Sequence, residues 1–229
     1  MARFPHSPTH FPFRIVGFDL DGTLLDTHLD LGAAVNHALA IVGRPPVPPE
    51  RVRDLIGGGG RKMLARALEL TGEIPQEEFA GLYEALLDHY RANIAVHTRL
   101  YPGGAAMLDR LAAAGVGLAV VTNKLESLAR AVLDQLALSG RFFTIIGGDT
   151  LGPGRAKPAP DPIEAMIARG GGGRAAFVGD TTYDIGAARA AGVLSIAVAF
   201  GFNDRPALEL GADAVIDHFD ELVPALLRL

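Results

Sequence analysis

Two aspartates stand two residues apart in the segment Phe18-Asp19-Leu20-Asp21-Gly22-Thr23, directly after a short apolar run. On an extended strand, residues at this spacing point to the same side, so both carboxylates can face one reacting group. Asp and Gly also favour turns, which leaves a purely structural turn as the alternative. Because a bare carboxylate at the end of a buried run would be costly, we favour a chemical role for Asp19 and Asp21.

Two further segments offer groups that suit an anion. Thr122 and Asn123 follow the apolar run 117–121, and Lys157 opens the segment Lys157-Pro158-Ala159-Pro160-Asp161-Pro162. Prolines restrict the backbone, so Lys157 would lose little additional freedom on binding an anion. The plainer alternatives are a helix N-cap at Thr122 and an exposed loop lysine at Lys157.

Asp180 and Asp184 complete the set of polar candidates. Asp180 follows the end of an apolar run, and Asp184 lies about one helical turn further on, so it could point back toward the same place. A first-turn carboxylate favoured by the helix dipole is the alternative for Asp184.

The elements between these residues must position them. Strands are predicted at 15–20, 117–121, 143–146, 175–178 and 194–199, and helices at 125–137, 161–168 and 184–191. This alternation predicts an α/β fold with a Rossmann-like parallel sheet core and helices on both faces. Ligands of such sheets bind at the carboxyl ends of strands, where three of the four polar segments lie. We therefore expect the candidates to converge on one site.

The stretch between the first strand and residue 101 follows a different pattern. Three helical patterns are expected there, at 31–42, 62–70 and 77–93. With no convincing strand pair among them, they predict an inserted α-helical cap. Hinge-like composition near 22–27 and 97–103 marks its two connections. The predicted division is a catalytic core of residues 1–24 and 99–229 and a cap of residues 25–98.

Composition narrows the class of partner. A net charge of −5 argues against nonspecific binding to nucleic acid or to an anionic membrane and favours a small-molecule partner. The absence of cysteine excludes disulfides and thiolate metal sites and fits a reducing compartment. Met1–Phe13 lacks the apolar centre of a secretion signal, and no apolar run reaches the roughly 18 residues of a membrane span. We expect a cytoplasmic protein with a loose N-terminal arm; its oligomeric state stays open.

Four carboxylates gathered at one site would repel one another and raise their pKa values unless a cation neutralised them. Oxygen ligands without Cys or His indicate a hard ion, and magnesium fits better than zinc. Together with Lys157 and Thr122, such a site suits a phosphoryl group in transfer, because charge stabilisation and positioning carry most of that catalysis.

The candidate residues resemble, in order, the four motifs of the haloacid dehalogenase superfamily of aspartate-nucleophile phosphotransferases. These are the DxDGT motif, the Thr of the second motif, the Lys of the third and the GDxxxD of the fourth, represented here by Asp19, Asp21, Gly22, Thr23, Thr122, Lys157, Asp180 and Asp184. The helical insertion after the first motif resembles the C1 cap. The runs VTNK, GGDT, KPxPDP and FVGD resemble those of phosphoglycolate phosphatases.

The resemblance implies a role for each residue. Asp19 would attack phosphorus, and Asp21 would protonate the leaving oxygen and later activate water. The phosphoryl oxygens would be held by Thr122, Asn123 and Lys157. The resemblance thus implies a phosphomonoesterase that forms an aspartyl-phosphate, with 2-phosphoglycolate as the best candidate substrate.

The same resemblance implies a Mg²⁺ cofactor. Its ligands would be Asp19, the backbone carbonyl of Asp21, and Asp180, with Asp184 close behind.

Within the cap, the run Gly57–Gly60 followed by Arg61 and Lys62 matches the place of a glycine-containing loop in the phosphoglycolate group. One or both cations could bind a substrate carboxylate. The alternative is that they are solvated first-turn residues of a helix. Sugar phosphates, nucleotides and pyrophosphate accordingly stay alternative substrates.

Three other classes of protein fit the sequence less well than an aspartate-nucleophile phosphatase. A signalling receiver domain gathers similar groups around a phosphorylated aspartate, but the DxDGT order and the cap argue against it. A mutase of the β-phosphoglucomutase kind is disfavoured because Leu31 stands where those proteins carry a His. A catalytically inactive interaction protein is the remaining alternative, against which the completeness of the four motifs argues.

Overall fold

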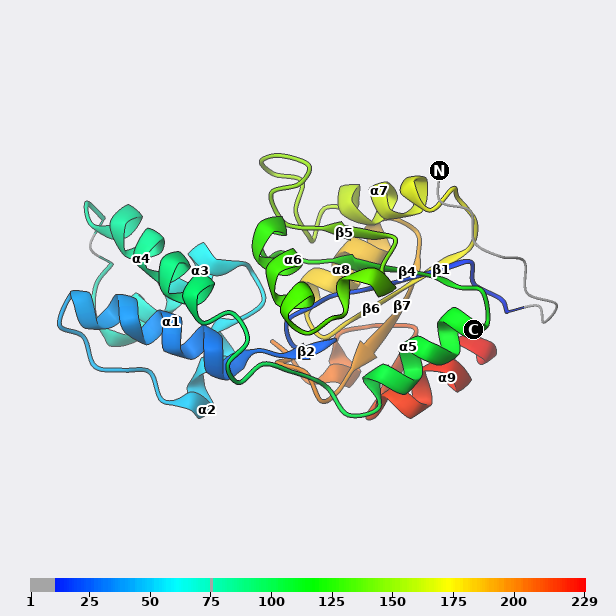
Figure 1. The fold of residues 1–229 in the computed structure, drawn as a ribbon, viewed down its shortest axis with the longest axis horizontal. Helices are drawn as coiled ribbons and strands as arrows, with labels where there is room; N and C mark the ends of the chain where they lie inside the picture. The colour runs from blue at the N-terminus through cyan, green and yellow to red at the C-terminus, as the bar shows by residue number, and fades with distance from the viewer. Residues whose placement is uncertain (1–10, 75) are drawn as a thin grey trace.

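The computed structural model describes residues 11–74 and 76–229 (Figure 1). Within these residues, six parallel strands form one sheet in the order β5-β4-β1-β6-β7-β8. Their bounds are β1 Ile15–Phe18, β4 Gly117–Val121, β5 Thr144–Ile146, β6 Ala175–Gly179, β7 Leu194–Val198 and β8 Ala214–Ile216. Because β1 lies between β4 and β6, the carboxyl ends of these three strands are adjacent.

Helices cover both faces of the sheet (Figure 1). They are α5 Gly104–Ala113, α6 Glu126–Gln135, α7 Asp161–Arg169, α8 Thr182–Ala190 and α9 Leu222–Arg228. One apolar cluster joins α5, α6 and α9 to one face, and another joins α7 and α8 to the opposite face. The predicted α/β fold with a Rossmann-like parallel sheet is confirmed.

Alternation along β1 shows why this strand is central. Val16 and Phe18 belong to the cluster under α5 and α9, whereas Ile15 belongs to the cluster under α7 and α8. Side chains of a strand point alternately to its two faces, so an apolar residue at every position fits a strand buried on both sides. Gly17 leaves room for α7, since a Cβ there would lie 2.3 Å from Met166 Sδ.

A separate group of helices, the cap helices, extends from the carboxyl edge of the sheet (Figure 1). They are α1 His28–Ile41, α2 Pro49–Val52, α3 Gly60–Thr71 and α4 Phe79–Ala92. Their apolar faces form their own cluster. The described residues also contain four short 3₁₀ helices: η1 Arg53–Leu55, η2 Ser139–Arg141, η3 Ala207–Glu209 and η4 Phe219–Glu221.

The two connections to the cap helices pair with each other. β2 Leu25–Asp26 and β3 Arg99–Leu100 form an antiparallel ladder, which corrects the expectation that this stretch holds no strand pair. A strand of two residues is too short to show an alternating apolar pattern in the sequence. The predicted boundaries at residues 25 and 98 adjoin this ladder, and the division into core and cap stays a prediction.

The structure differs from the sequence-based expectations in two further places. β8, α5 and α9 were not predicted, because short or small-residue segments give weak periodicity. Most of the expected arm Met1–Phe13 lies outside the described residues, but Phe13 itself is buried in the core beneath the guanidinium of Arg174. Among the described residues, no helix combines the length and apolarity that would let it cross a membrane.

Candidate active site

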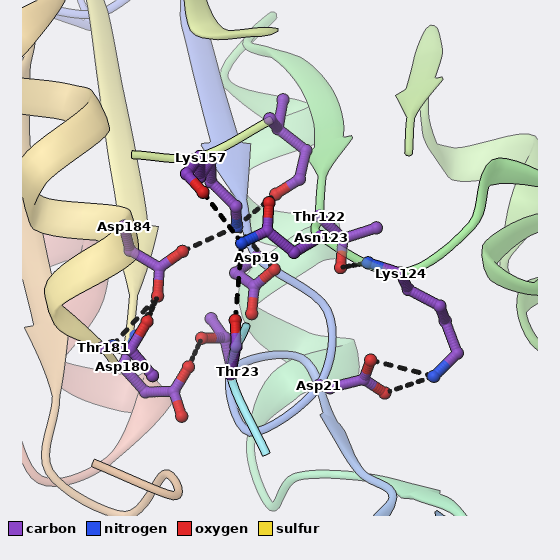
Figure 2. Close-up of polar contacts among 12 residues, drawn as sticks. Asp19, Asp21, Thr23, Thr122, Asn123, Lys124, Lys157, Asp180, Thr181 and Asp184 are labelled. Carbon is purple, nitrogen blue, oxygen red and sulfur yellow. Dashed lines mark hydrogen bonds and ion pairs between the residues drawn. The ribbon is translucent and has the colours of Figure 1, made fainter. Parts of the chain in front are cut away.

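Three adjacent strands end in polar residues at one edge of the sheet. Asp19 follows β1, Thr122 follows β4 and Asp180 follows β6. Figure 2 shows these side chains converging with Lys157 and Asp184. The expected convergence of the candidates therefore holds for these five residues.

Lys157 lies at the centre of this group. Its Nζ donates hydrogen bonds to Asp19 Oδ1 at 2.7 Å, to Asp184 Oδ1 at 2.6 Å and to the backbone carbonyl of Val121 at 2.8 Å. Burial alone would lower the pKa of Lys157, but the carboxylates of Asp184 and Asp19 outweigh it and raise that pKa. The lysine is thus held charged and is buried, which rules out the exposed loop lysine considered from the sequence.

Asp184 combines the two roles considered for it. It is the N3 residue of α8, and its Oδ2 accepts hydrogen bonds from the backbone N–H and the hydroxyl of Thr181 in a capping box. Its Oδ1 points to Lys157. The helix therefore fixes this carboxylate in one orientation beside the other acids.

Asp180 is fully buried and is held by residues outside its own strand. Its Oδ1 accepts a hydrogen bond from the hydroxyl of Thr23 at 2.9 Å, and its Oδ2 accepts one from the backbone N–H of Phe202 at 2.8 Å. Burial, followed by the nearby carboxylates of Asp184 and Asp19, raises its pKa well above the usual range. Thr23 thus supports Asp180, a role that the sequence did not indicate beyond its place in the first motif.

The arrangement of the carboxylates fits a divalent cation. Asp19, Asp180 and Asp184 each offer an oxygen, and these atoms lie within 4.8 Å of one another. Burial raises the pKa of Asp19 to about 6 even though Lys157 opposes the shift. Three buried carboxylates against one ammonium leave negative charge uncompensated, and hard oxygen donors suit Mg²⁺.

Asp21 stands apart from this cluster. Its carboxylate points away from Asp19 toward Lys124 (Figure 2). Lys124 Nζ lies 2.9 Å from each Asp21 oxygen. The two acids of the first motif are thus held by different lysines.

Lys124 was not among the sequence-derived candidates. It is buried, and the charge of Asp21 raises its pKa although burial opposes this. The sequence feature that could have identified Lys124 is its place directly after Thr122 and Asn123, because one loop at a strand end presents all three residues.

The neighbouring Thr122 and Asn123 organise the loops around Asp19. Thr122 Oγ1 accepts a hydrogen bond from the backbone N–H of Lys124 at 3.2 Å. The Asn123 side-chain amide donates to the backbone carbonyl of Lys157 at 3.0 Å and to that of Gly57 at 3.4 Å. Asn123 therefore links the loop after β4 to the lysine loop and to the cap.

A cavity of about 50 Å³ lies between the cap helices and the core. From the core it is lined by Asp19, Asp21 and the residues Thr122 to Leu125. From the cap it is lined by the glycine run, of which Gly57, Gly59 and Gly60 take part, and by residues of α4.

The two cap cations proposed from the sequence do not line this cavity. The Arg61 guanidinium stacks 4.8 Å from the ring centre of Tyr83, and Lys62 Nζ lies 4.9 Å from that of Tyr183. Both side chains are exposed, and neither residue is among those that line the cavity. Their role in specificity stays a prediction.

Comparison with known proteins agrees with this geometry. A family model described as haloacid dehalogenase-like hydrolase matches residues 16–198. The chain is 45% identical over 212 residues to a phosphoglycolate phosphatase from Agrobacterium fabrum, covering 91% of this chain and 90% of the relative. It is 37% identical over 220 residues to an N-acetylmuramic acid 6-phosphate phosphatase from Pseudomonas aeruginosa, covering 94% and 95%.

A solved structure extends the comparison to the fold. The crystal structure of a predicted phosphoglycolate phosphatase from Haemophilus somnus superposes with a TM-score of 0.88 at 30% sequence identity, covering 94% of this chain and 99% of that one. The resemblance inferred from the four motifs is confirmed. The chain therefore belongs to the haloacid dehalogenase-like hydrolase family.

Proposed function

We propose that the chain hydrolyses a small phosphate monoester through an aspartyl-phosphate on Asp19, with 2-phosphoglycolate as the best candidate substrate. The observation that carries this proposal is the different environment of the two aspartates. Asp19 lies within the carboxylate cluster beside Lys157, while Asp21 lies outside it and faces the cavity. Two acids separated in this way suit a nucleophile and an acid/base partner.

In the first step, an Asp19 carboxylate oxygen attacks phosphorus and the bond from phosphorus to the ester oxygen breaks. Asp21, in its protonated form, gives its proton to the leaving oxygen. In the second step, Asp21 takes a proton from water as that water attacks phosphorus, and Asp19 is released as a carboxylate. Lys157, Thr122 and Asn123 are proposed to hold the phosphoryl oxygens through both steps.

The proposed ligands of Mg²⁺ are Asp19, the Asp21 backbone carbonyl and Asp180, with Asp184 close behind. When bound, the cation would offset the negative charge of the carboxylates and the phosphoryl group. Lys157 also compensates this negative charge, since it is already paired with Asp19 and Asp184.

Two substrate classes are supported by relatives. The similarity to the Agrobacterium phosphoglycolate phosphatase favours 2-phosphoglycolate. The similarity to the Pseudomonas N-acetylmuramic acid 6-phosphate phosphatase makes a sugar phosphate the second candidate. We further propose a cytoplasmic protein that acts without a nucleic-acid or membrane partner, as its net negative charge and lack of cysteine suggest.

Initial rates over a panel of phosphate esters test the proposal. The panel contains 2-phosphoglycolate, N-acetylmuramic acid 6-phosphate, other sugar phosphates, nucleotides and pyrophosphate, each with Mg²⁺ and with a chelator. We expect the highest kcat/KM with 2-phosphoglycolate and loss of turnover in the chelator. A preference for a nucleotide or pyrophosphate would reject the substrate assignment, and turnover unaffected by the chelator would reject the role of Mg²⁺.

A further inference from the structure

The cavity above Asp19 contains one feature that the proposed chemistry does not use. Of the described residues that line it, Lys124 is the one cation. Most of the others are apolar or glycine, including Leu86 and Leu87 of α4. In such surroundings a charged group has a strong effect on which ligand binds, because few polar groups or waters compete with it.

Lys124 is positioned from both the core and the cap. Its Nζ contacts Asp21 at 2.9 Å and lies 4.6 Å from the ring centre of Tyr90. An ammonium group has three N–H donors, and the two Asp21 oxygens accept at most two of them, so one donor remains for a ligand.

Tyr90 supplies a second observation. The residue is 1% exposed, and it lines the same cavity from α4. Within the described part of the chain its hydroxyl has no hydrogen bond of regular geometry, and the polar group that interacts with it is the Lys124 ammonium. An ammonium group can only donate, so the tyrosine O–H still lacks an acceptor, and this favours a ligand that accepts its hydrogen bond.

We propose that Lys124 and Tyr90 bind the carboxylate of the substrate's leaving group. This inference rests on the proposed function and names the part of the enzyme that would select a carboxylated substrate. In 2-phosphoglycolate the carboxyl carbon is two bonds from the ester oxygen that Asp21 protonates. Because Lys124 contacts Asp21, a substrate whose ester oxygen lies beside Asp21 would have its carboxylate within reach of the Lys124 ammonium.

The proposal differs from the sequence-based assignment of this role to Arg61 and Lys62. Those two cations are exposed and do not line the cavity, although Arg61 stacks on Tyr83, which does line it. Lys124 is 8% exposed and opens onto the same space as the nucleophile.

A pair of substrates isolates the carboxylate. The ratio of kcat/KM for 2-phosphoglycolate to kcat/KM for 2-hydroxyethyl phosphate is measured, because the second compound replaces the carboxylate with a hydroxymethyl group. Lys124→Met also removes the partner of Asp21 and so slows both reactions, but this effect cancels in the ratio. We expect the ratio to fall at least tenfold in Lys124→Met, to fall less in Tyr90→Phe and to be largely retained in Lys124→Arg.

Lys62→Met and Arg61→Ala serve as comparison variants that test the cap assignment. A ratio that is unchanged in Lys124→Met, or that falls only in Lys62→Met or Arg61→Ala, overturns the inference. If Lys124→Met does not fold, as judged by circular dichroism, an unchanged ratio in Tyr90→Phe overturns it instead. Failure of the wild-type enzyme to hydrolyse either compound would reject the proposed substrate class, which is a separate result.

Discussion

Lys157 Nζ lies 2.7 Å from Asp19 Oδ1, with both side chains buried beneath the cavity. The contact fixes the orientation of the proposed nucleophile before any substrate arrives. The second carboxylate oxygen, Asp19 Oδ2, takes no part in this hydrogen bond.

Asp19→Asn preserves the shape of the side chain and keeps an oxygen for Lys157, but it removes the nucleophilic carboxylate. We expect a folded protein whose Mg²⁺-dependent hydrolysis falls by about a thousandfold or more. Initial rates and circular dichroism check this. Asp109→Asn is the matched control, since Asp109 is 65% exposed and pairs with Arg141 on the surface. Turnover in Asp19→Asn close to that of the control would exclude the covalent mechanism.

Asp21→Asn leaves Asp19 in place but cannot donate or accept a proton. With a substrate whose leaving group needs no proton, such as p-nitrophenyl phosphate, we expect the aspartyl-phosphate to form and then to hydrolyse about 10²–10⁴-fold more slowly. Acid quenching with ³²P-labelled substrate would detect the trapped enzyme. If no label is retained, Asp21 does not have a separate acid/base role.

Gly22 adopts a φ of +89°, and a Cβ there would lie 2.2 Å from Asp180 Oδ2. Gly22→Ala must therefore displace the carboxylate that is proposed to bind Mg²⁺. We expect the Mg²⁺ concentration for half-maximal activity to rise at least about tenfold. Gly172→Ala is the control for backbone strain, because Gly172 has a φ of +77° and no atom within 4 Å of the added Cβ. Equal effects of the two substitutions would show strain alone.

The residues that come together at strand ends could be predicted from the sequence. Contacts that depend on the direction of a long side chain could not. The convergence of Asp19 and Asp180 follows from their places after adjacent parallel strands. The partnership of Lys124 with Asp21 does not, because the residues are 103 positions apart and a lysine can reach in several directions. For the same reason the sequence could not tell that Arg61 would stack on Tyr83.

The cap connection depends on one buried carboxylate. Asp30 Oδ2 accepts hydrogen bonds from the Thr98 hydroxyl at 2.7 Å and the Thr98 backbone N–H at 2.8 Å, and both its oxygens lie 3.0 Å from the His97 backbone N–H. It thereby ties the start of α1 to the segment that leaves the cap.

Asp30→Asn removes the charge and replaces one acceptor with a donor. We expect the free energy of unfolding to fall by about 1.5–3 kcal/mol in urea denaturation. For the control Asp88→Asn, whose side chain is 74% exposed, we expect a change within about 0.5 kcal/mol. Similar losses in the two variants would mean that the Asp30 contacts do not stabilise the fold.

The raised pKa of Asp19 gives the metal-free protein a distinctive pH dependence. Its folded pKa of about 6 lies above the ordinary aspartate pKa of 3.8, so between these values the folded state binds more protons than the unfolded state. The stabilisation from this group is present at low pH and is lost as pH rises through about 6, and the upward shift in the pKa of Asp180 acts in the same direction.

In a chelator, the thermal midpoint of the wild type should therefore fall relative to that of Asp19→Asn as pH rises from about 4 to about 7. Added Mg²⁺ should reverse this fall near pH 7, because a cation favours the ionised carboxylates. A metal-free wild type that gains stability relative to Asp19→Asn over this range would show that burial does not raise the pKa of the nucleophile.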